Sequence, residues 1–367
     1  MEYKICTRCI MDTSDLDIKF DENGTCNNCR EYEEKVKKRV FKGKEGEEKL
    51  NKILDEIKEK GKNKKYNCVV GFSGGTDSSY VMYLVKKLGL RALAVHLDNG
   101  WNSKTATRNI SKLLKKLNVN LYTYVIDWEE FKDLQLAYLK ASVIDIEALT
   151  DHAIKAAMYK AANEYGIKFI ITGINLATEG IIPKDWGHHK NDYANIIDIY
   201  KKFGTKELKT YPILTISKRF YYQIIKNIRV IEILNYVDYN KKDAQKLLKE
   251  EFGWDDYGGK HRESTFTHFF QSYILPRKFG VDKRRAHLSS LVLAGEISRD
   301  EALKEIEKPI YNEEELKRER EYIMRKFGLS EEEFEKLMNL PIKSHYYYKS
   351  NEKLLRRLRK IYLKIIN

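Results

Sequence analysis

Four short hydrophobic runs in the middle of the chain alternate with stretches in which hydrophobic residues recur at helical spacing. Short apolar runs predict buried strands, and a period of three to four residues predicts amphipathic helices. The predicted strands cover 67–72, 92–97, 121–126 and 168–171. The predicted helices between them cover about 79–88, 104–117 and 151–165. Because such alternation is typical of a doubly wound parallel sheet, we predict an α/β fold.

The segments on either side lack this alternation. Residues 33–65 are rich in charge and carry one apolar stripe at helical spacing, formed by Leu50, Ile53, Leu54 and Ile57. A lysine-rich break follows, so we expect a docking helix and a linker. After residue 215 strand signals become sparse and helical signals dominate. An aromatic stripe in this part is predicted to be core rather than a platform that stacks a ligand, and it consists of Phe266, Phe269, Phe270 and Tyr273.

These patterns divide the chain into four predicted units. They are a four-cysteine domain over 1–35, a helical linker over 36–65, the α/β domain over 66–215 and a helical domain over 216–367 that closes over a substrate. A length of 367 residues fits several units, because a domain usually contains roughly 100 to 200 residues.

Composition limits the class of protein. With 42% hydrophobic and 33% charged residues the chain should fold, and it contains no apolar run near the roughly 18 residues of a membrane span. The start of the chain also lacks the apolar core of a signal peptide. We therefore expect a cytoplasmic protein without membrane insertion. The net charge of +14 suits polyanionic partners, although lysine-rich stretches such as 58–65 are typical of solvated helix faces.

Four of the five cysteines form two pairs with metal-site spacing, Cys6 with Cys9 and Cys26 with Cys29. Four thiolates at this spacing form the tetrahedral shell that structural zinc prefers. The alternatives are an iron–sulfur cluster on the same ligands and four unrelated reduced cysteines. A segment with so little apolar content needs the metal to fold, and a closed shell leaves no position for a substrate. The predicted role of zinc is therefore structural.

A loop of small residues lies between the first predicted strand and the first predicted helix. It contains Ser73, Gly74, Gly75, Thr76, Asp77 and Ser78. Small residues let the backbone approach an anion, and the amides at the start of a helix bind phosphate. The common NTPase loop has a lysine at the helix start, whereas this chain has Asp77. A carboxylate beside phosphates is explained if it binds Mg²⁺, and the alternative is that Asp77 only caps the helix.

The stretch from Ser73 to Ser78 resembles the PP-loop of the N-type ATP pyrophosphatases, which adenylate a carbonyl or amide oxygen and release pyrophosphate. Two further stretches are similar to the N-acetyl sugar amidotransferase family of bacterial surface-polysaccharide pathways, including those of pseudaminic and legionaminic acid. The first is residues 6–13, which contain Cys6 and Cys9, together with the second cysteine pair, Cys26 and Cys29. The other is residues 279–290, with the sequence FGVDKRRAHLSS. The resemblance covers nearly the whole chain and implies a PP-loop sheet with zinc knuckles and a helical closing region.

The resemblance implies an ATP-dependent carbon–nitrogen ligase. In the implied reaction the acetamido oxygen of a nucleotide-linked N-acetyl sugar attacks ATP, ammonia-derived nitrogen replaces that oxygen, and AMP and pyrophosphate are released. The product carries an acetamidino group. The implied cofactors are ATP, Mg²⁺ and Zn²⁺.

The resemblance also implies roles for residues outside the loop. His96 and Asp98 end the second predicted strand, where this fold binds adenine, and Asp98 is either a second metal ligand or a turn residue. Gly173 ends the fourth predicted strand and should face ATP. A leaving pyrophosphate needs cations, so Lys283 and Arg284 are predicted to act catalytically with Asp77, and Arg285 belongs to the same run.

The loop after Gly173 offers side chains that could contact the sugar nucleotide. They are Glu179, Lys184, Trp186, His188 and His189. Each of them taken alone is more typical of a surface or packing residue.

The alternative function is that of a tRNA-modifying, thiolase-like enzyme that binds RNA through a basic surface. Thiolation needs an accessible cysteine, and only Cys68 is left after the four predicted metal ligands. This residue lies in an apolar strand, where a thiol is buried and inert. We therefore expect no nucleic-acid partner.

No cysteine is suited to hydrolysing glutamine either, since the chain starts with Met1 and Glu2 and Cys68 is predicted to be buried. We expect the protein to use free ammonia or to receive it from separate glutaminase and ammonia-channel subunits, which the resemblance also implies. The zinc knuckles and the basic linker are candidate docking surfaces.

Overall fold

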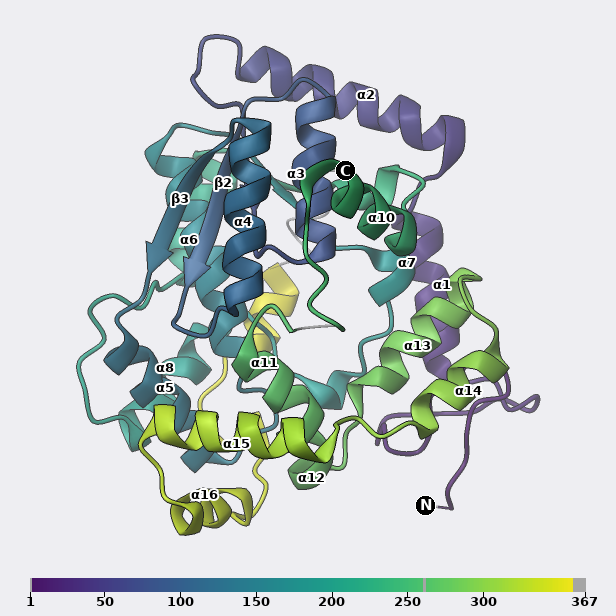
Figure 1. Cartoon of the computed structure of the whole chain (residues 1–367), viewed down its shortest axis with the longest axis vertical. Coiled ribbons are helices and arrows are strands. Elements are labelled where there is room, and N and C mark those ends of the chain that lie inside the picture. The colour runs from purple at the N-terminus through teal and green to yellow at the C-terminus, as the bar shows by residue number, and fades with distance from the viewer. Residues whose placement is uncertain (1, 260–261, 359–367) are drawn as a thin grey trace.

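The computed structural model describes residues 2–259 and 262–358 (Figure 1). Its centre is a sheet of five parallel strands in the order β3-β2-β1-β4-β5. The strands are β1 (Cys68–Gly71), β2 (Ala92–Asp98), β3 (Asn120–Val125), β4 (Phe169–Thr172) and β5 (Arg229–Glu232). The four strands predicted from hydrophobic runs are all present, which confirms the α/β class and the parallel sheet.

The order of the strands reverses at β1. On one edge of β1, Cys68 is aligned with Ala92 of β2, and on the other edge Val69 is aligned with Ile170 of β4. The chain passes from β1 to β2 and β3, and only then to β4 and β5 on the opposite side. Such a reversal leaves a crevice at the carboxyl ends of the strands, where open parallel sheets bind ligands. The residues that follow β1 and β4 therefore face this crevice.

The fifth strand corrects the sequence analysis. β5 lies beyond residue 215, where the sequence predicts a largely helical region, yet it pairs with β4 along its whole length. Ile231 is the one buried residue of this edge strand, and Val230 is exposed. Residues 228–234 (IRVIEIL) are rich in β-branched residues and form a short strand signal, which the helical prediction for this part of the chain did not include.

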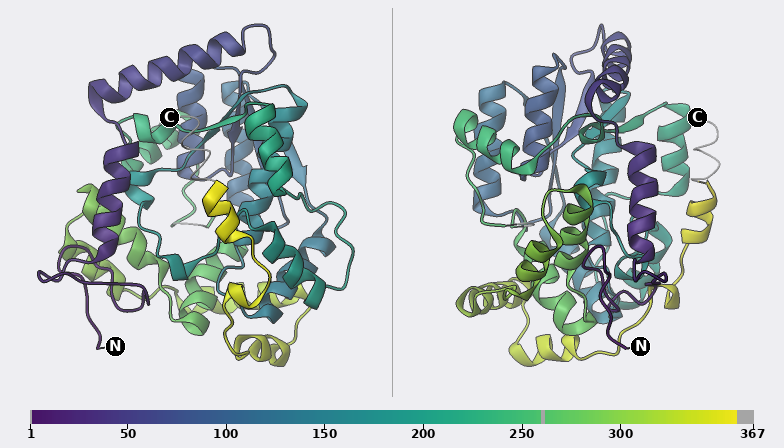
Figure 2. Two further views of the ribbon diagram at one scale, coloured as in Figure 1. Left: turned by 180° about the vertical axis from the view of Figure 1, so that it is seen from behind. Right: turned by 90° about the vertical axis from the view of Figure 1, so that its right-hand side faces the viewer.

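Helices cover both faces of the sheet (Figure 2). Side chains alternate along β1, so Val70 belongs to a hydrophobic cluster with one set of helices, and Val69 belongs to a cluster with α6 on the other face. The first set consists of α2 (Gly43–Lys60), α3 (Thr76–Lys87), α4 (Lys104–Leu117) and α10 (Lys241–Phe252), and α6 spans Ala148–Glu164. The three helices predicted between the first four strands are thus confirmed as α3, α4 and α6.

The helix α2 is docked on the sheet. Leu50, Leu54 and Ile57 are buried and belong to the same hydrophobic cluster as Val70. Their spacing places them on one face of the helix, as the predicted stripe requires. Figure 1 shows α2 lying across one end of the sheet. The docking helix within the predicted linker is therefore confirmed, and it contributes to the core of the sheet.

The remaining described chain is largely helical. The other helices are α1 (Asn27–Arg39), α5 (Trp128–Ala141), α7 (Leu176–Glu179), α8 (Tyr193–Phe203), α9 (Ile216–Phe220), α11 (Thr265–Phe269), α12 (Leu275–Phe279), α13 (Lys283–Ala294), α14 (Arg299–Glu307), α15 (Glu313–Phe327) and α16 (Glu331–Met338). Short 3₁₀ and π segments are η1 (Lys184–Trp186), η2 (Tyr221–Ile225), η3 (Ile233–Tyr236), η4 (Phe270–Ile274) and η5 (His345–Tyr347). Within the described ranges no helix has both the length and the apolar character needed to span a bilayer.

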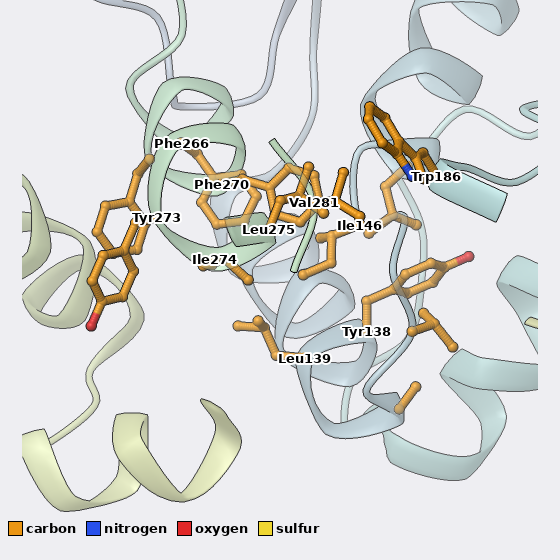
Figure 3. Packing of buried hydrophobic residues seen from close by; sticks show 14 of the residues in the cluster. Tyr138, Leu139, Ile146, Trp186, Phe266, Phe270, Tyr273, Ile274, Leu275 and Val281 are labelled. Atoms are coloured by element: carbon orange, nitrogen blue, oxygen red, sulfur yellow. The ribbon is translucent and has the colours of Figure 1, made fainter. Parts of the chain in front are cut away.

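The aromatic stripe of Phe266, Phe269, Phe270 and Tyr273 lies in the hydrophobic core, as predicted (Figure 3). All four of its residues are buried, and the rings of Phe269 and Tyr273 stack with centroids 5.0 Å apart. The stripe belongs to a cluster that also contains Tyr138 and Leu139 of α5. This second core holds the C-terminal helices against the segment between β3 and β4.

We predict that Leu54→Ala lowers the free energy of unfolding by about 2–4 kcal/mol, because it opens a cavity between α2 and the sheet. Lys52→Ala, at an exposed position of the same helix, should change it by less than about 0.5 kcal/mol. Urea unfolding followed by circular dichroism measures both effects. If the two variants unfold alike, α2 is only a loosely attached linker.

Candidate active site

The loop of residues 73–78, called the phosphate loop below, joins the carboxyl end of β1 to the start of α3. Gly74 has a φ of +82°, and a β-carbon there would lie 2.7 Å from the carbonyl oxygen of Ala106. Only glycine fits this position. The amide of Gly75 donates a hydrogen bond to Ser73 Oγ at 3.3 Å, which closes the turn. The loop thus presents its backbone at the N-terminus of a helix, an arrangement that binds phosphate.

A cavity of about 200 Å³ lies beside the phosphate loop. It sits in the crevice of the sheet, because the loop after β1 forms one wall and Gly173 after β4 forms another. A β-carbon at Gly173 would lie 3.3 Å from the amide nitrogen of Ser78, so the two strand ends are in close contact. The lining residues are Ser73, Gly75, Thr76, Asp77, Ser78, Gly173, Glu179, Lys241, Tyr257 and Glu263.

The structure therefore brings together most of the residues predicted to bind ATP. The predicted residues in the lining are Ser73, Gly75, Thr76, Asp77, Ser78 and Gly173. Gly74 shapes the turn from behind, against α4. Their contact with ATP stays a prediction, but their common position in one cavity follows from the geometry.

Asp77 lies in the first turn of α3 and lines the cavity together with Glu179 of α7. Tyr239 donates a hydrogen bond to Asp77 Oδ1. Burial, with the charge of Asp77 as a further cause, raises the pKa of Tyr239, so the phenol keeps its proton and remains a donor. The start of the helix also favours a charged carboxylate on Asp77. Glu263 is a third carboxylate in the lining, and carboxylates are ligands of the type that Mg²⁺ prefers, so this donor set fits the predicted ion.

Three residues of the cavity were not identified from the sequence: Lys241, Tyr257 and Glu263. The Tyr257 hydroxyl accepts a hydrogen bond from the Thr76 amide at 2.9 Å. Lys241 begins α10 and is the one cation among the described lining residues. No local pattern marks these residues, because they reach the phosphate loop only through the path of the chain after β5.

His96 and Asp98 support the turn after β2 and are not in the lining of the cavity. His96 Nδ1 is 2.9 Å from the Phe72 carbonyl oxygen, and Nε2 is 3.0 Å from Asn102 Nδ2. Burial lowers the pKa of His96, which favours the neutral ring. Asp98 Oδ1 accepts hydrogen bonds from the Gly100 amide at 3.0 Å and from Asn102. Asp98 therefore has the contacts of a turn residue, and the predicted adenine site at this strand end stays a prediction.

Lys283 and Arg284 are not among the residues that line the cavity, and their catalytic role stays a prediction. Arg284 donates hydrogen bonds to Asp282 Oδ2 at 2.8 Å and to the carbonyl oxygens of Ile306 and Lys308. These partners lie at the start of α13 and at the end of α14, so the guanidinium is held by the protein itself. Among the described residues that line the cavity, the cation is Lys241.

The side chains of the loop after β4 that were predicted to contact the sugar nucleotide lie in different places. Glu179 lines the cavity. Lys184 forms an ion pair with Glu31 at 3.4 Å, while Trp186 and His188 are buried. These last three side chains therefore serve packing and surface contacts.

The four cysteines of the predicted metal site lie together. Their sulfur atoms are within 4.8 Å of one another, and all four residues are buried. The amides of Arg8 and Cys26 donate hydrogen bonds to Cys6 Sγ at 3.4 and 3.3 Å. Such bonds favour the thiolate, which is the form that binds a metal. The donor set fits a closed four-sulfur site.

The C-terminal helices hold this cysteine cluster in place. Arg299 of α14 donates a hydrogen bond to the Cys6 carbonyl oxygen at 2.9 Å. Arg285 of α13 donates to the Ile10 carbonyl oxygen at 2.8 Å and forms an ion pair with Asp12 at 3.1 Å. Figure 1 shows the N-terminal segment beside α13 and α14. Arg285 therefore anchors the N-terminal segment.

Two family models match separate parts of the chain. The model described as NAD synthase matches residues 47–227, and the model described as LPS biosynthesis protein WbpG-like, C-terminal domain, matches residues 263–362. The first match contains four of the five strands and the phosphate loop. The second begins at Glu263 in the wall of the cavity.

Known proteins also resemble this chain. An uncharacterized protein of Methanocaldococcus jannaschii is 27% identical over 71% of this chain and 80% of its own length. A tRNA(Ile)-lysidine synthase of Chlamydia pneumoniae is 35% identical over 20% of this chain and 23% of its own length. A tRNA-specific 2-thiouridylase of Clostridium botulinum is 24% identical over 48% of this chain and 53% of its own length. The chain thus spans less than two thirds of these two tRNA enzymes.

Solved structures with partial similarity include two synthetases. The NH3-dependent NAD synthetase from Campylobacter jejuni has 19% identity and a TM-score of 0.30, with 56% of this chain and 84% of that chain covered. The NMN synthetase from Francisella tularensis has 17% identity and a TM-score of 0.30, with 61% and 92% covered. The fold is defined by the strand order of the parallel sheet. The phosphate loop on this parallel sheet and the two matching family models support the PP-loop ATP pyrophosphatase superfamily.

Proposed function

We propose that this chain is an ATP-dependent amidotransferase that converts the acetamido group of a nucleotide-linked N-acetyl sugar into an acetamidino group. The observation that carries the proposal is the phosphate-loop cavity with its three carboxylates, joined in one chain to a WbpG-like C-terminal segment. The description of that segment names LPS biosynthesis, which supports a sugar of a surface polysaccharide as the substrate.

The proposed chemistry turns a poor leaving group into a good one. The acetamido oxygen attacks the α-phosphorus of ATP, and the bond from that phosphorus to the bridging oxygen breaks, so that pyrophosphate leaves with the electron pair. Ammonia then adds to the activated carbon and loses a proton, and AMP departs with the original amide oxygen. The site must align the two reactants and keep water from the adenylate.

The residues of the cavity can meet these needs. The amides of the phosphate loop hold the β- and γ-phosphates at the start of α3, and Lys241 offsets the charge of the departing pyrophosphate. Asp77 and Glu179 are the candidate ligands of Mg²⁺, which supplies further neutralisation of phosphate charge when bound.

A tRNA-modifying enzyme is the second candidate, because two relatives are tRNA enzymes and the net charge is +14. Cysteine positions oppose the thiolase form of this alternative. Cys68 is fully buried, burial raises its pKa to about 12, and the other four cysteines lie in the cluster. A gel-shift titration with tRNA separates the two functions, since tight binding favours the tRNA enzyme.

We predict that the purified chain forms an amidine with ammonium but not with glutamine. The assay combines ATP, either nitrogen source and a panel of UDP- and CMP-linked acetamido sugars, and mass spectrometry detects replacement of oxygen by NH. Glutamine should fail because the one cysteine outside the cluster is buried. Addition of a separate glutaminase partner should restore the use of glutamine. Amidine and glutamate from glutamine alone would refute the need for a partner, and no product with any sugar would refute the proposed substrate class.

Asp77→Asn should slow AMP release at least about 100-fold, because a neutral amide is a weak ligand for Mg²⁺ beside the phosphates. The variant should still fold, since asparagine keeps an oxygen that can accept the Tyr239 hydrogen bond. Asp55→Asn, at an exposed position of α2, is the matched control and should leave the rate unchanged. Near-normal turnover of Asp77→Asn would falsify the assignment of this loop as the catalytic site.

We propose that the cysteine cluster holds structural zinc. Cys26→Ser should lose the metal and lower the thermal stability, because a closed site contributes its binding free energy to folding. Cys68→Ala removes a buried thiol outside the cluster and should keep the metal. Elemental analysis and thermal denaturation provide the readouts. A metal-free Cys26→Ser protein of unchanged stability contradicts the structural role, and bound iron with visible absorption points to an iron–sulfur cluster instead.

A further inference from the structure

Three lysines gather on the side of the crevice that is covered by α6. This lysine cluster consists of Lys155 in α6, Lys190 in the loop before α8 and Lys283 at the start of α13. Lys190 Nζ forms an ion pair with Asp145 and lies 3.4 Å from Asp151 Oδ2. Lys155 and Lys283 both lie within electrostatic reach of Lys190 and of the same two carboxylates.

The cluster holds three lysines against the two carboxylates of Asp145 and Asp151. Lys190 takes both neighbouring carboxylates as ion-pair partners. Within the described residues, Lys155 and Lys283 form no hydrogen bond or ion pair, although both are only partly exposed to solvent. Burial lowers the pKa of both lysines, which is the cost of holding an ammonium group away from water without a partner. An anionic ligand would remove that cost.

A nearby glutamate adds little negative charge to the cluster at neutral pH. Burial raises the pKa of Glu147 to about 7, so its carboxyl group is partly protonated there. Glu147 Oε2 accepts a hydrogen bond from Thr267 Oγ1 at 2.8 Å, and Ser264 Oγ lies 2.9 Å from Thr267 Oγ1. Ser264 follows Glu263, which lines the phosphate-loop cavity. These contacts connect the cluster to a wall of that cavity.

The geometry of α6 places the cluster beyond the end of β1. Met158 of α6 packs against Gly71, the last residue of β1, where a β-carbon would lie 2.8 Å from the Met158 sulfur. The chain leaves α6 to enter β4 at the amino edge of the sheet, so lower residue numbers in α6 lie nearer the carboxyl edge. Lys155 is on the same helical face as Met158 and about 4.5 Å further along the axis. It therefore faces the crevice into which the phosphate loop also opens.

We propose that Lys155 and Lys283 bind the diphosphate of a sugar that is linked to a nucleoside diphosphate such as UDP, and this proposal rests on the proposed function. The phosphates of ATP already have the loop amides, the start of α3 and Lys241 on the other side of the sheet. A second anion site on the α6 side suits the second phosphorylated reactant. Held there by its diphosphate, the acceptor can extend its acetamido group toward the phosphate loop across the end of β1.

The test is a binding titration that needs no turnover. UDP, GDP and CDP are titrated by calorimetry into protein whose phosphate loop is saturated with a non-hydrolysable ATP analogue. The wild-type protein should bind at least one of them, and Lys155→Met and Lys283→Met should each weaken that binding at least tenfold. Lys155→Arg and Lys283→Arg keep the charge and should restore most of it. Lys160→Met, on the same helix but exposed and paired with Glu164, is the matched control and should bind normally.

The outcomes separate this proposal from the proposed function. If no nucleoside diphosphate binds the wild-type protein, or if the methionine variants bind as well as it does, the lysine cluster is not a diphosphate site. If these variants lose the ATP analogue instead, the lysines serve ATP and the proposal is wrong. If they lose only the nucleoside diphosphate in a protein that forms no amidine, the anion site stands and the amidation reaction fails.

Discussion

The turn at the end of β1 is the constraint on which the candidate site depends. β1 is paired on both edges, and its continuation is still held by a hydrogen bond from the Phe72 amide to the Val95 carbonyl oxygen at 2.8 Å. The positive φ of Gly74 then directs the chain into α3 while its α-carbon packs against the backbone at Ala106 of α4. A side chain at this glycine would have to displace the main chain of a neighbouring helix. The direction of the loop amides, the position of Asp77 and the contact with Gly173 all follow from this turn.

The two faces of the sheet present different anion-binding groups to the same crevice. On the α3 side the groups are backbone amides and a helix start, with Lys241 as a cation from α10. On the α6 side they are lysine side chains, two of them without a partner in the described protein. Because β1 ends between the two sets, two phosphorylated reactants bound in this way would meet at its carboxyl end.

The cysteine cluster is connected to the cavity through α1 and α7. Cys29 is in α1, and Tyr32 of the same helix donates a hydrogen bond to the Ala177 carbonyl oxygen of α7 at 2.6 Å. α7 also contains Glu179, which lines the cavity. Arg285 anchors the N-terminal segment to α13 from the other side. A metal that orders the N-terminal segment would therefore also support a wall of the cavity, without taking part in chemistry.

The sequence by itself determined the features that depend on neighbouring residues. Four strands were predictable because each is a local hydrophobic run. The phosphate loop was predictable because a run of small residues between a strand and a helix is typical of phosphate binding. The pairing of Cys6 with Cys9 and of Cys26 with Cys29 follows from spacing alone, although their meeting in one cluster is a tertiary contact.

Only the tertiary structure decided which charged side chains reach the crevice. Arg285 meets Ile10, which is 275 residues away in the sequence, and Tyr257 meets Thr76 across 181 residues. A run of basic residues has the same sequence whether it binds a nucleotide or a carbonyl oxygen, because its partner is set by packing between distant segments. The strand β5 was missed although residues 228–234 (IRVIEIL) are rich in β-branched residues, whereas its place beside β4 is a tertiary contact that no local pattern specifies.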